Sequence, residues 1–339
     1  MTSEGKKGIL WEFEGLGRVG VDRQSRTENT GFNTRVKIMA NEINRRSFLK
    51  ESAALPVLAA TGLGLVSNRS YGQRKVKRVG ESRLKTSICA YSMRKYFGEG
   101  KMNIDDFIEY AAKLGFDGTE LTFYYFPNYP QRCSNEYLYH VKKKAFLAGL
   151  EINGTAVGND FCVSDKDKLA QEIKKVKTWT ECASKLGTPE MRVFGGRVPD
   201  GDTEEACVNR AVEAFKECCD HASKYGVMLA LENHGGICTS AEQVLNIIKR
   251  VDSEWMGANL DTGNFRSDEP YKEIAMTAPY ALTCHVKVSV KGEEVDMDRV
   301  VKILHEANYS GYLPIEYEEK EDPMTGVPKF LAKIREALS

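Results

Sequence analysis

Residues 227–236, V-M-L-A-L-E-N-H-G-G, show the pattern that decides the fold. A short apolar run ends in an acidic residue, Glu232, and a glycine pair follows. Similar runs recur in M-G-A-N-L-D-T-G-N, L-T-C-H-V-K and Y-L-P-I-E-Y, where the polar residues are Asp261, His285 and Glu316. These four residues are about 24 to 31 positions apart, roughly the length of one strand–helix unit. The spacing therefore predicts a repeating β/α architecture.

Short apolar runs alternate with longer amphipathic stretches from about residue 84 to the C-terminus, as in parallel β/α units. The predicted strands are residues 85–91, 118–123, 151–157, 190–194, 227–232, 257–261, 282–287 and 313–317. The predicted helices are residues 103–114, 135–148, 167–186, 203–225, 240–251, 271–276, 297–307 and 327–338. A glycine comes directly after four of these helices: Gly115, Gly149, Gly187 and Gly226. Glycine readily takes the left-handed conformation that ends a helix.

Eight strands and eight helices in strict alternation match the count and size of a (β/α)8 TIM barrel. We therefore predict an α/β fold with one domain, the barrel, over residues 73–339. A doubly wound open sheet is the alternative. That fold would place a glycine-rich phosphate loop after its first strand, and the C-A-Y-S-M-R sequence at 89–94 contains none.

The amino-acid composition argues against two kinds of protein, nucleic-acid-binding proteins and zinc ribbons. The chain has 48 basic and 48 acidic residues and no net charge, so we expect no nucleic acid partner. A local basic patch stays open, because net charge averages over the whole surface. The nine cysteines include no C-x-x-C pair, which argues against a zinc ribbon.

Residues 1–72 read as an N-terminal extension rather than part of the barrel. The sequence N-R-R-S-F-L-K at 44–50 contains the pair Arg45 and Arg46, and the apolar run 52–66 follows. That run is short for a membrane span and suits the h-region of a signal peptide. The segment resembles a bacterial twin-arginine signal, which implies export of the folded protein to the periplasm or the medium. We expect no stable membrane insertion after signal processing.

The four polar residues at the strand ends predict a metal site. In a (β/α)8 barrel the carboxyl ends of the strands meet on one face, where active sites lie. Three carboxylates and one imidazole would then converge, and carboxylates buried together repel strongly unless a cation joins them. A strand-end carboxylate taken alone is often only a loop residue. The recurrence of four such residues in phase with the repeat favours a divalent metal.

The motifs L-E-N-H, L-D-T-G-N, H-V-K and I-E-Y resemble the xylose-isomerase-like superfamily of sugar phosphate isomerases and epimerases, which includes ketose 3-epimerases and hydroxypyruvate isomerases. The resemblance extends from about Lys85 to the C-terminus. It implies that Glu232, Asp261, His285 and Glu316 bind one divalent metal, Mn²⁺, Mg²⁺, Co²⁺ or Zn²⁺. Ligation mostly by oxygen favours Mn²⁺ or Mg²⁺. It also implies a homodimer or homotetramer.

The resemblance further implies isomerisation or epimerisation of a small sugar or sugar-like ketose through an enediolate. The metal would acidify the C–H bond beside the carbonyl. Glu232 and Glu316 would act as the catalytic acid and base on opposite sides of the substrate.

Five further residues are candidates for substrate binding. His234 and Lys287 each come two residues after a predicted ligand and would share its strand face. Glu120 lies within the second predicted strand, and Arg197, after a glycine pair, could clamp an anionic substrate. Asn264 occupies a position where many relatives carry a substrate-contacting histidine. Because an amide cannot act as acid or base, this departure weakens a close assignment to the sugar 3-epimerases.

Three other functions compete with this one. Abasic-site endonucleases of the same superfamily need histidines on the early strands, and the first four predicted strands contain none. A metal-dependent lyase or dehydratase acting on 3-keto-sugars or glycosides would use the same enolisation. A non-catalytic sugar-binding barrel is the third alternative. The lyase and the binding protein stay open at this point.

Overall fold

The structure is a computed structural model, and it describes residue 80 and residues 83–339. The Arg45–Arg46 motif and the apolar run 52–66 lie outside the described residues, so the export signal stays a prediction. Within the part of the chain that is described, no helix combines the length and apolar character needed to cross a membrane.

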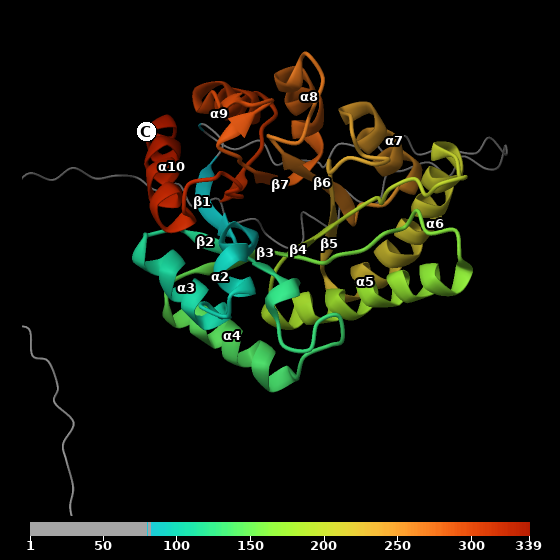
Figure 1. Ribbon diagram of the computed structural model, residues 1–339, viewed down its shortest axis with the longest axis horizontal. Coiled ribbons are helices and arrows are strands. Elements are labelled where there is room, and N and C mark those ends of the chain that lie inside the picture. Colours follow the sequence, from blue (N-terminus) through green and yellow to red (C-terminus); the bar gives the residue numbers. More distant parts are fainter. Residues whose placement is uncertain (1–79, 81–82) are drawn as a thin grey trace, which may run out of the picture. The chain divides into compact units, whose positions relative to one another are not determined.

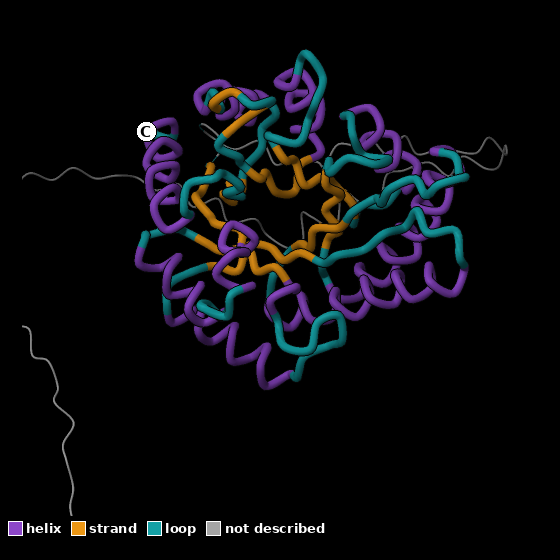
Figure 2. Tube along the Cα trace, viewed as in Figure 1, coloured by secondary structure: helices purple, strands orange, loops and turns teal. Residues whose placement is uncertain are grey.

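Eight parallel strands form the barrel in the order β10-β1-β2-β3-β4-β5-β6-β7. A bridge between Val286 and Ile315 joins β7 to β10 and closes the ring, which encircles the centre of Figure 2. All eight predicted strands are present. Their bounds are β1 Leu84–Cys89, β2 Gly118–Thr122, β3 Glu151–Ala156, β4 Glu190–Val193, β5 Met228–Glu232, β6 Met256–Asp261, β7 Ala281–His285 and β10 Gly311–Ile315.

Helices surround the strand ring on its outer side (Figure 1). They are α2 Arg94–Gly98, α3 Ile104–Lys113, α4 Asn135–Leu147, α5 Lys166–Leu186, α6 Glu204–Ala222, α7 Ala241–Val251, α8 Pro270–Thr277, α9 Met297–Glu306 and α10 Pro323–Ala337. The four glycines predicted to end helices all have positive φ, between 67° and 86°. Polar side chains cap several helix starts; Asn103 and Ser240, for example, form capping boxes at α3 and α7.

Several elements differ from the sequence prediction. The first strand ends at Cys89 rather than residue 91, because a 3-10 turn over Ala90–Met93 follows it. The seventh strand ends at His285 rather than residue 287, because Val286 pairs with β10 and the chain then forms the small hairpin of β8 (Ser289–Val290) and β9 (Glu293–Glu294). The last helix begins at Pro323, four residues early, since Asp322 accepts a hydrogen bond from the Met324 amide. The short helix α2 was not predicted.

The barrel has two interiors of opposite character. Between strands and helices the core is apolar, with Trp179, Phe107 and Phe215 fully buried. Inside the strand ring, charged and polar side chains are buried, among them Glu190 and Arg192 at 2% exposure each. Buried ionisable groups need partners, so this interior points to a functional site.

Candidate metal and sugar site

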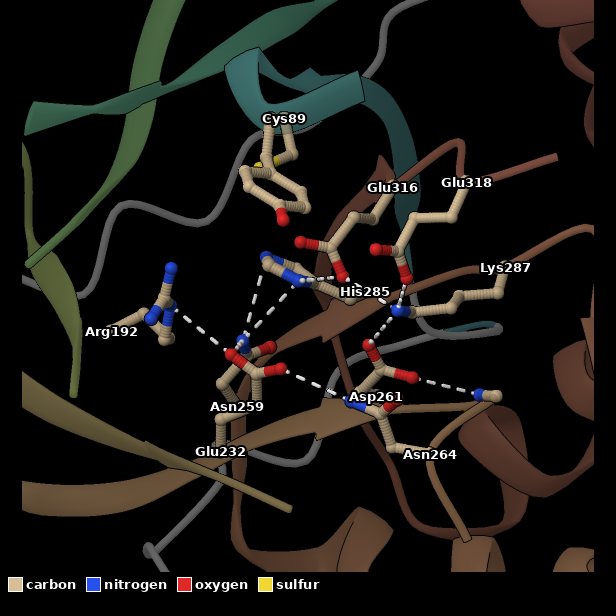
Figure 3. A network of polar contacts seen from close by, with 12 residues as sticks. Cys89, Arg192, Glu232, Asn259, Asp261, Asn264, His285, Lys287, Glu316 and Glu318 are labelled. Carbon is tan, nitrogen blue, oxygen red and sulfur yellow. Dashed lines mark hydrogen bonds and ion pairs between the residues drawn. The ribbon is translucent and has the colours of Figure 1, made fainter. Parts of the chain in front are cut away.

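Three of the four predicted ligands lie together at the carboxyl ends of β6, β7 and β10. One ligand atom each from Asp261, His285 and Glu316 lies within 4.8 Å of the others. The strand register produces this arrangement, since Asp261 pairs with His285 and Glu316 follows the bridge that closes the barrel. All three side chains are buried, and Figure 3 shows them facing a common centre.

The fourth predicted ligand, Glu232 at the end of β5, is not a member of that group and is held by other partners. Its Oε2 lies 3.1 Å from Nε of Arg192, and its Oε1 accepts a hydrogen bond of 3.2 Å from Nδ2 of Asn264. Asn259 approaches Oε2 at 3.5 Å. Figure 3 shows the Glu232 carboxylate between Arg192 and Asn264, beside the cluster.

Lys287 lies against the predicted ligands, beyond the end of β7. Its Nζ is 3.1 Å from Oε2 of Glu316 and 3.4 Å from Oδ2 of Asp261, and it also pairs with Glu318. A shared strand face with His285 was therefore the wrong reason for placing it in the site, although the residue does reach it. One ammonium group faces three carboxylates here.

The charges of this cluster fit a divalent cation. Burial, together with the charges of Glu316 and Glu232, raises the pKa of Asp261 well above its usual range, although Lys287 opposes the shift. Oδ2 of Asp261 is buried without a hydrogen-bond partner among the described residues. Burial also acts to raise the pKa of Glu316, but Lys287 and His285 hold that pKa well below its usual range. A divalent cation would compensate Asp261 more fully than Lys287, whose ammonium is shared with Glu316 and Glu318.

His234 and Arg197 line a neighbouring pocket of about 200 Å³ together with Glu232. Both side chains are exposed and lie on loops after β5 and β4. β5 ends at Glu232, as the sequence predicts, so His234 does not share a strand face with that residue. The His234 ring instead packs against Phe194, with 4.5 Å between ring centroids. The two residues are thus placed where the far end of a substrate could reach them.

Glu120 lies inside the barrel, next to His285. Its Oε2 is 2.6 Å from Nε2 of His285, and both side chains are fully buried. Burial alone would lower the pKa of His285, but the charge and hydrogen bond of Glu120 raise it well above its usual range. Glu120 therefore contacts one predicted ligand, His285, from inside the barrel.

Sequence reasoning missed Arg192, which lies in the middle of β4. Its guanidinium group is stacked 3.9 Å from the Phe194 ring centroid and donates a hydrogen bond of 3.1 Å to the Tyr124 hydroxyl. It also pairs with Glu232. The available sequence signal was the strand E-M-R-V, in which two charged residues alternate in an otherwise apolar context. A charged residue inside a buried strand normally has a partner.

In the aromatic segment 123–126, some side chains pack in the core and one reaches the site. Phe123 and Phe126 are buried against Trp179, at centroid distances of 4.4 Å and 6.3 Å. Tyr124 turns the other way and meets Arg192, and burial raises its pKa to about 12. The hydroxyl is therefore a neutral hydrogen-bonding group at ordinary pH.

Comparison with known proteins agrees with this architecture. The family model described as "Xylose isomerase-like TIM barrel" matches residues 108–336. No curated protein sequence matches the chain. Among solved structures, D-psicose 3-epimerase from Clostridium cellulolyticum H10 is similar at a TM-score of 0.64 and 18% identity, over 75% of this chain and 99% of that one.

Two further structures have comparable similarity. L-ribulose 3-epimerase has a TM-score of 0.62 at 18% identity, over 75% of this chain and 94% of that one. The 3-keto-D-glucoside 4-epimerase from E. coli has a TM-score of 0.62 at 16% identity, over 75% of this chain and 100% of that one. Such low identities show the shared fold alone. With most of the barrel matched by the family model, the chain belongs to the xylose isomerase-like TIM barrel family.

Proposed function

We propose that this protein is a divalent-metal-dependent isomerase or epimerase of a small sugar or sugar-like ketose. The observation that carries the proposal is the buried group of Asp261, His285 and Glu316, with the Glu232 carboxylate beside it. Three carboxylates and an imidazole at the carboxyl face of a barrel are suited to Mn²⁺ or Mg²⁺, with Co²⁺ or Zn²⁺ as alternatives. The structural neighbours named as ketose 3-epimerases support a ketose as substrate.

Two carboxylates, Glu316 and Glu232, would carry out the proton transfers. A bound divalent ion would acidify the C–H bond beside the substrate carbonyl and stabilise the charge of an enediolate. Lys287 and His285 hold the pKa of Glu316 low against the effect of burial, which favours the ionised carboxylate that a base requires. Glu232 would exchange a proton with the substrate from its own side. Arg192 and Asn264 fix the direction in which the Glu232 carboxylate points.

Lys287, His234 and Arg197 would complete substrate recognition. With a cation bound to Asp261 and Glu316, the Lys287 ammonium would be free to hold a substrate oxygen while Glu318 keeps it nearby. The pocket lined by His234 and Arg197 adjoins Glu232 and would receive the end of the substrate remote from the carbonyl. Asn264 holds the Glu232 carboxylate and so supplies no acid or base of its own.

The cellular setting is part of the proposal. The sequence around Arg45 and Arg46 supports export by the twin-arginine route, so the substrate would be a saccharide of the periplasm or the medium. The neighbour named as a 3-keto-D-glucoside 4-epimerase makes keto-glycosides sensible members of a substrate panel. Elimination from such a compound would instead indicate the lyase alternative.

The test is proton exchange with solvent. Separate samples of the purified protein are loaded with Mn²⁺ or with Mg²⁺, and the Mg²⁺ sample is used for NMR. Each is incubated in D₂O with ketoses, hydroxypyruvate and 3-keto-glycosides. We expect deuterium at the carbon beside the carbonyl of one compound class, and its loss after chelation and in Glu316→Gln. Glu319→Gln, which alters an exposed carboxylate three residues along the chain, should behave as the parent. A metal-loaded parent that exchanges no compound would contradict the proposal.

A further inference from the structure

Three structural features converge on Glu120. It is fully buried in the middle of β2, and the pairing of β2 with β3 is irregular between Thr119 and Glu120. Thr119 pairs with Ile152, but Glu120 pairs with Gly154, so Asn153 is an extra residue on β3. Such bulges re-aim side chains and are frequent beside active sites. Here the bulge leaves Glu120 opposite a glycine inside the barrel.

Gly154 leaves space for two buried glutamates, Glu190 and Glu120. A Cβ atom at this position would lie 3.2 Å from Cγ of Glu120 and 1.9 Å from Oε1 of Glu190. Any side chain here would therefore displace one of the two buried carboxyl groups. The barrel interior is thus shaped around both.

The two oxygens of Glu120 have separate partners. Oε2 lies 2.6 Å from Nε2 of His285, within hydrogen-bond distance, and Oε1 accepts a hydrogen bond of 3.4 Å from the Cys89 thiol. Cys89 is fully buried, and burial followed by the charge of Glu120 raises the pKa of its thiol well above the usual range. Cys89, Glu120 and His285 thus form a chain of polar contacts inside the barrel.

Among the described residues, Glu120 makes the shortest polar contact with the His285 ring, and it contacts Nε2 alone. Nδ2 of Asn259 is almost equally far from the two ring nitrogens, at 3.4 Å from Nδ1 and 3.5 Å from Nε2. A directed hydrogen bond from the Asn259 amide would bring it clearly closer to one nitrogen, so Asn259 does not favour either. The Glu120 carboxylate lies only at Nε2, whereas Nδ1 faces Oε2 of Glu316 at 3.6 Å, on the side of the ligand cluster.

We propose that Glu120 is a positioning residue that keeps the proton of His285 on Nε2 and aims Nδ1 at the cation site. His285 would therefore bind the metal through Nδ1. Carboxylates that accept from the remote nitrogen of a ligand histidine fix its tautomer and increase its basicity. This inference deepens the metal site of the proposed function, and it reassigns Glu120 from substrate binding to support of a ligand.

Glu190 provides a matched control. It is a second carboxyl buried in the same barrel interior, but neither of its oxygens has a hydrogen-bond partner among the described residues. Burial and then the charge of Glu120 raise its pKa well above the usual range. Glu190→Gln therefore changes a buried carboxyl without removing a hydrogen bond to His285.

The first experiment measures metal affinity by competition with a chelating dye. We expect Glu120→Gln to weaken Mn²⁺ and Zn²⁺ binding by about 10- to 100-fold, because an amide donates as readily as it accepts and no longer enforces the proton on Nε2. Glu120→Leu should weaken it further, and Glu190→Gln should leave it unchanged. Equal affinities for the parent and Glu120→Gln would overturn the proposal.

The second experiment reads the ring nitrogens directly, by NMR of protein with ¹⁵N-labelled histidine. In the Zn²⁺-loaded parent we expect one ring with a protonated Nε2 and a metal-shifted Nδ1; a metal shift at Nε2 would overturn the proposal. In the metal-free parent the hydrogen-bonded Nε2 proton should be visible, retained in Glu190→Gln and lost in Glu120→Leu. A parent that binds no metal would defeat the proposed function, while this metal-free comparison would still decide the role of Glu120.

Discussion

The two halves of the barrel contribute to the site in different ways. In the ligand half, made of β5, β6, β7 and β10, the functional side chain comes at the very end of the strand or one residue beyond it. In the support half, made of β1 to β4, the contributing residues Glu120 and Arg192 lie inside their strands and touch ligand-half residues, His285 and Glu232. One half presents the groups that would bind and react, and the other fixes their direction.

The largest expected effect comes from the ligand half. Glu232→Gln should lower the rate of deuterium exchange by about 10²- to 10⁴-fold, because it removes a proton-transferring carboxylate. Glu190→Gln, in the support half, should retain the parent rate since Glu190 contacts neither substrate nor ligand. Exchange rates followed by NMR check both variants. If the two fell equally, the division between the halves would fail.

Arg192→Leu should be costly for folding. Arg192 and Glu232 are both almost fully buried, and removal of one partner leaves an uncompensated charge. We expect the free energy of unfolding of the metal-free protein to fall by about 3–5 kcal/mol. Urea denaturation of Arg192→Leu and of the double variant with Glu232→Leu checks the cause. The double variant should recover much of the loss; equal losses would show that the ion pair is not responsible.

Gly154→Ala should disturb the support half through packing alone. Its new methyl group would lie 1.9 Å from Oε1 of Glu190, which must move. Overpacking of this kind costs about 1–3 kcal/mol of unfolding free energy. The cost should shrink in a Glu190→Ala background. Gly98→Ala, where no atom lies within 4 Å of the added Cβ, is the matched control. A loss that persists without Glu190 would refute the steric explanation.

The smallest expected effect concerns Lys287, whose ammonium faces two predicted ligands. Lys287→Met should raise metal affinity on the order of tenfold, less than the full Coulomb repulsion because the side chain can turn toward Glu318. The same variant should lower turnover if the ammonium holds substrate. Lys291→Met, which removes an exposed partner of Asp268, is the control in the dye competition. Weaker metal binding in Lys287→Met would assign the residue a structural role instead.

The difference between the halves also explains what the sequence could reveal. The residues Asp261, His285 and Glu316 were predictable because each interrupts an apolar run at the period of the barrel repeat. The Glu120–His285 contact was not, since it depends on strands far apart in the chain and on a bulge that shifts the register of β2 against β3. The alternation of Glu190 and Arg192 in the four-residue strand β4 marks a shared face, but it does not reveal that Arg192 pairs with Glu232 on the next strand.

The errors near the ligands have one physical cause. Lys287 was placed by a predicted strand that extends to residue 287, and His234 by the assumption that the strand ending at Glu232 could continue. Both strands instead end at the ligand, β5 at Glu232 and β7 at His285. After β7, Val286 pairs with Ile315 to close the barrel, and the β8–β9 hairpin follows. No local residue preference marks the end of β7 in the sequence. Lys287 nevertheless reaches the cluster because its side chain is long.

Metal binding by the purified protein tests the central claim most directly. The protein is stripped with a chelator, equilibrated with Mn²⁺, and its bound ion is counted and titrated by competition with a dye. We predict a single tightly bound ion in the parent and in Asp268→Asn, an exposed aspartate. We predict severe loss in Asp261→Asn, which alters the buried carboxyl without a hydrogen-bond partner on Oδ2. A parent that retains no ion, or an Asp261→Asn variant that binds as tightly as the parent, would contradict the account.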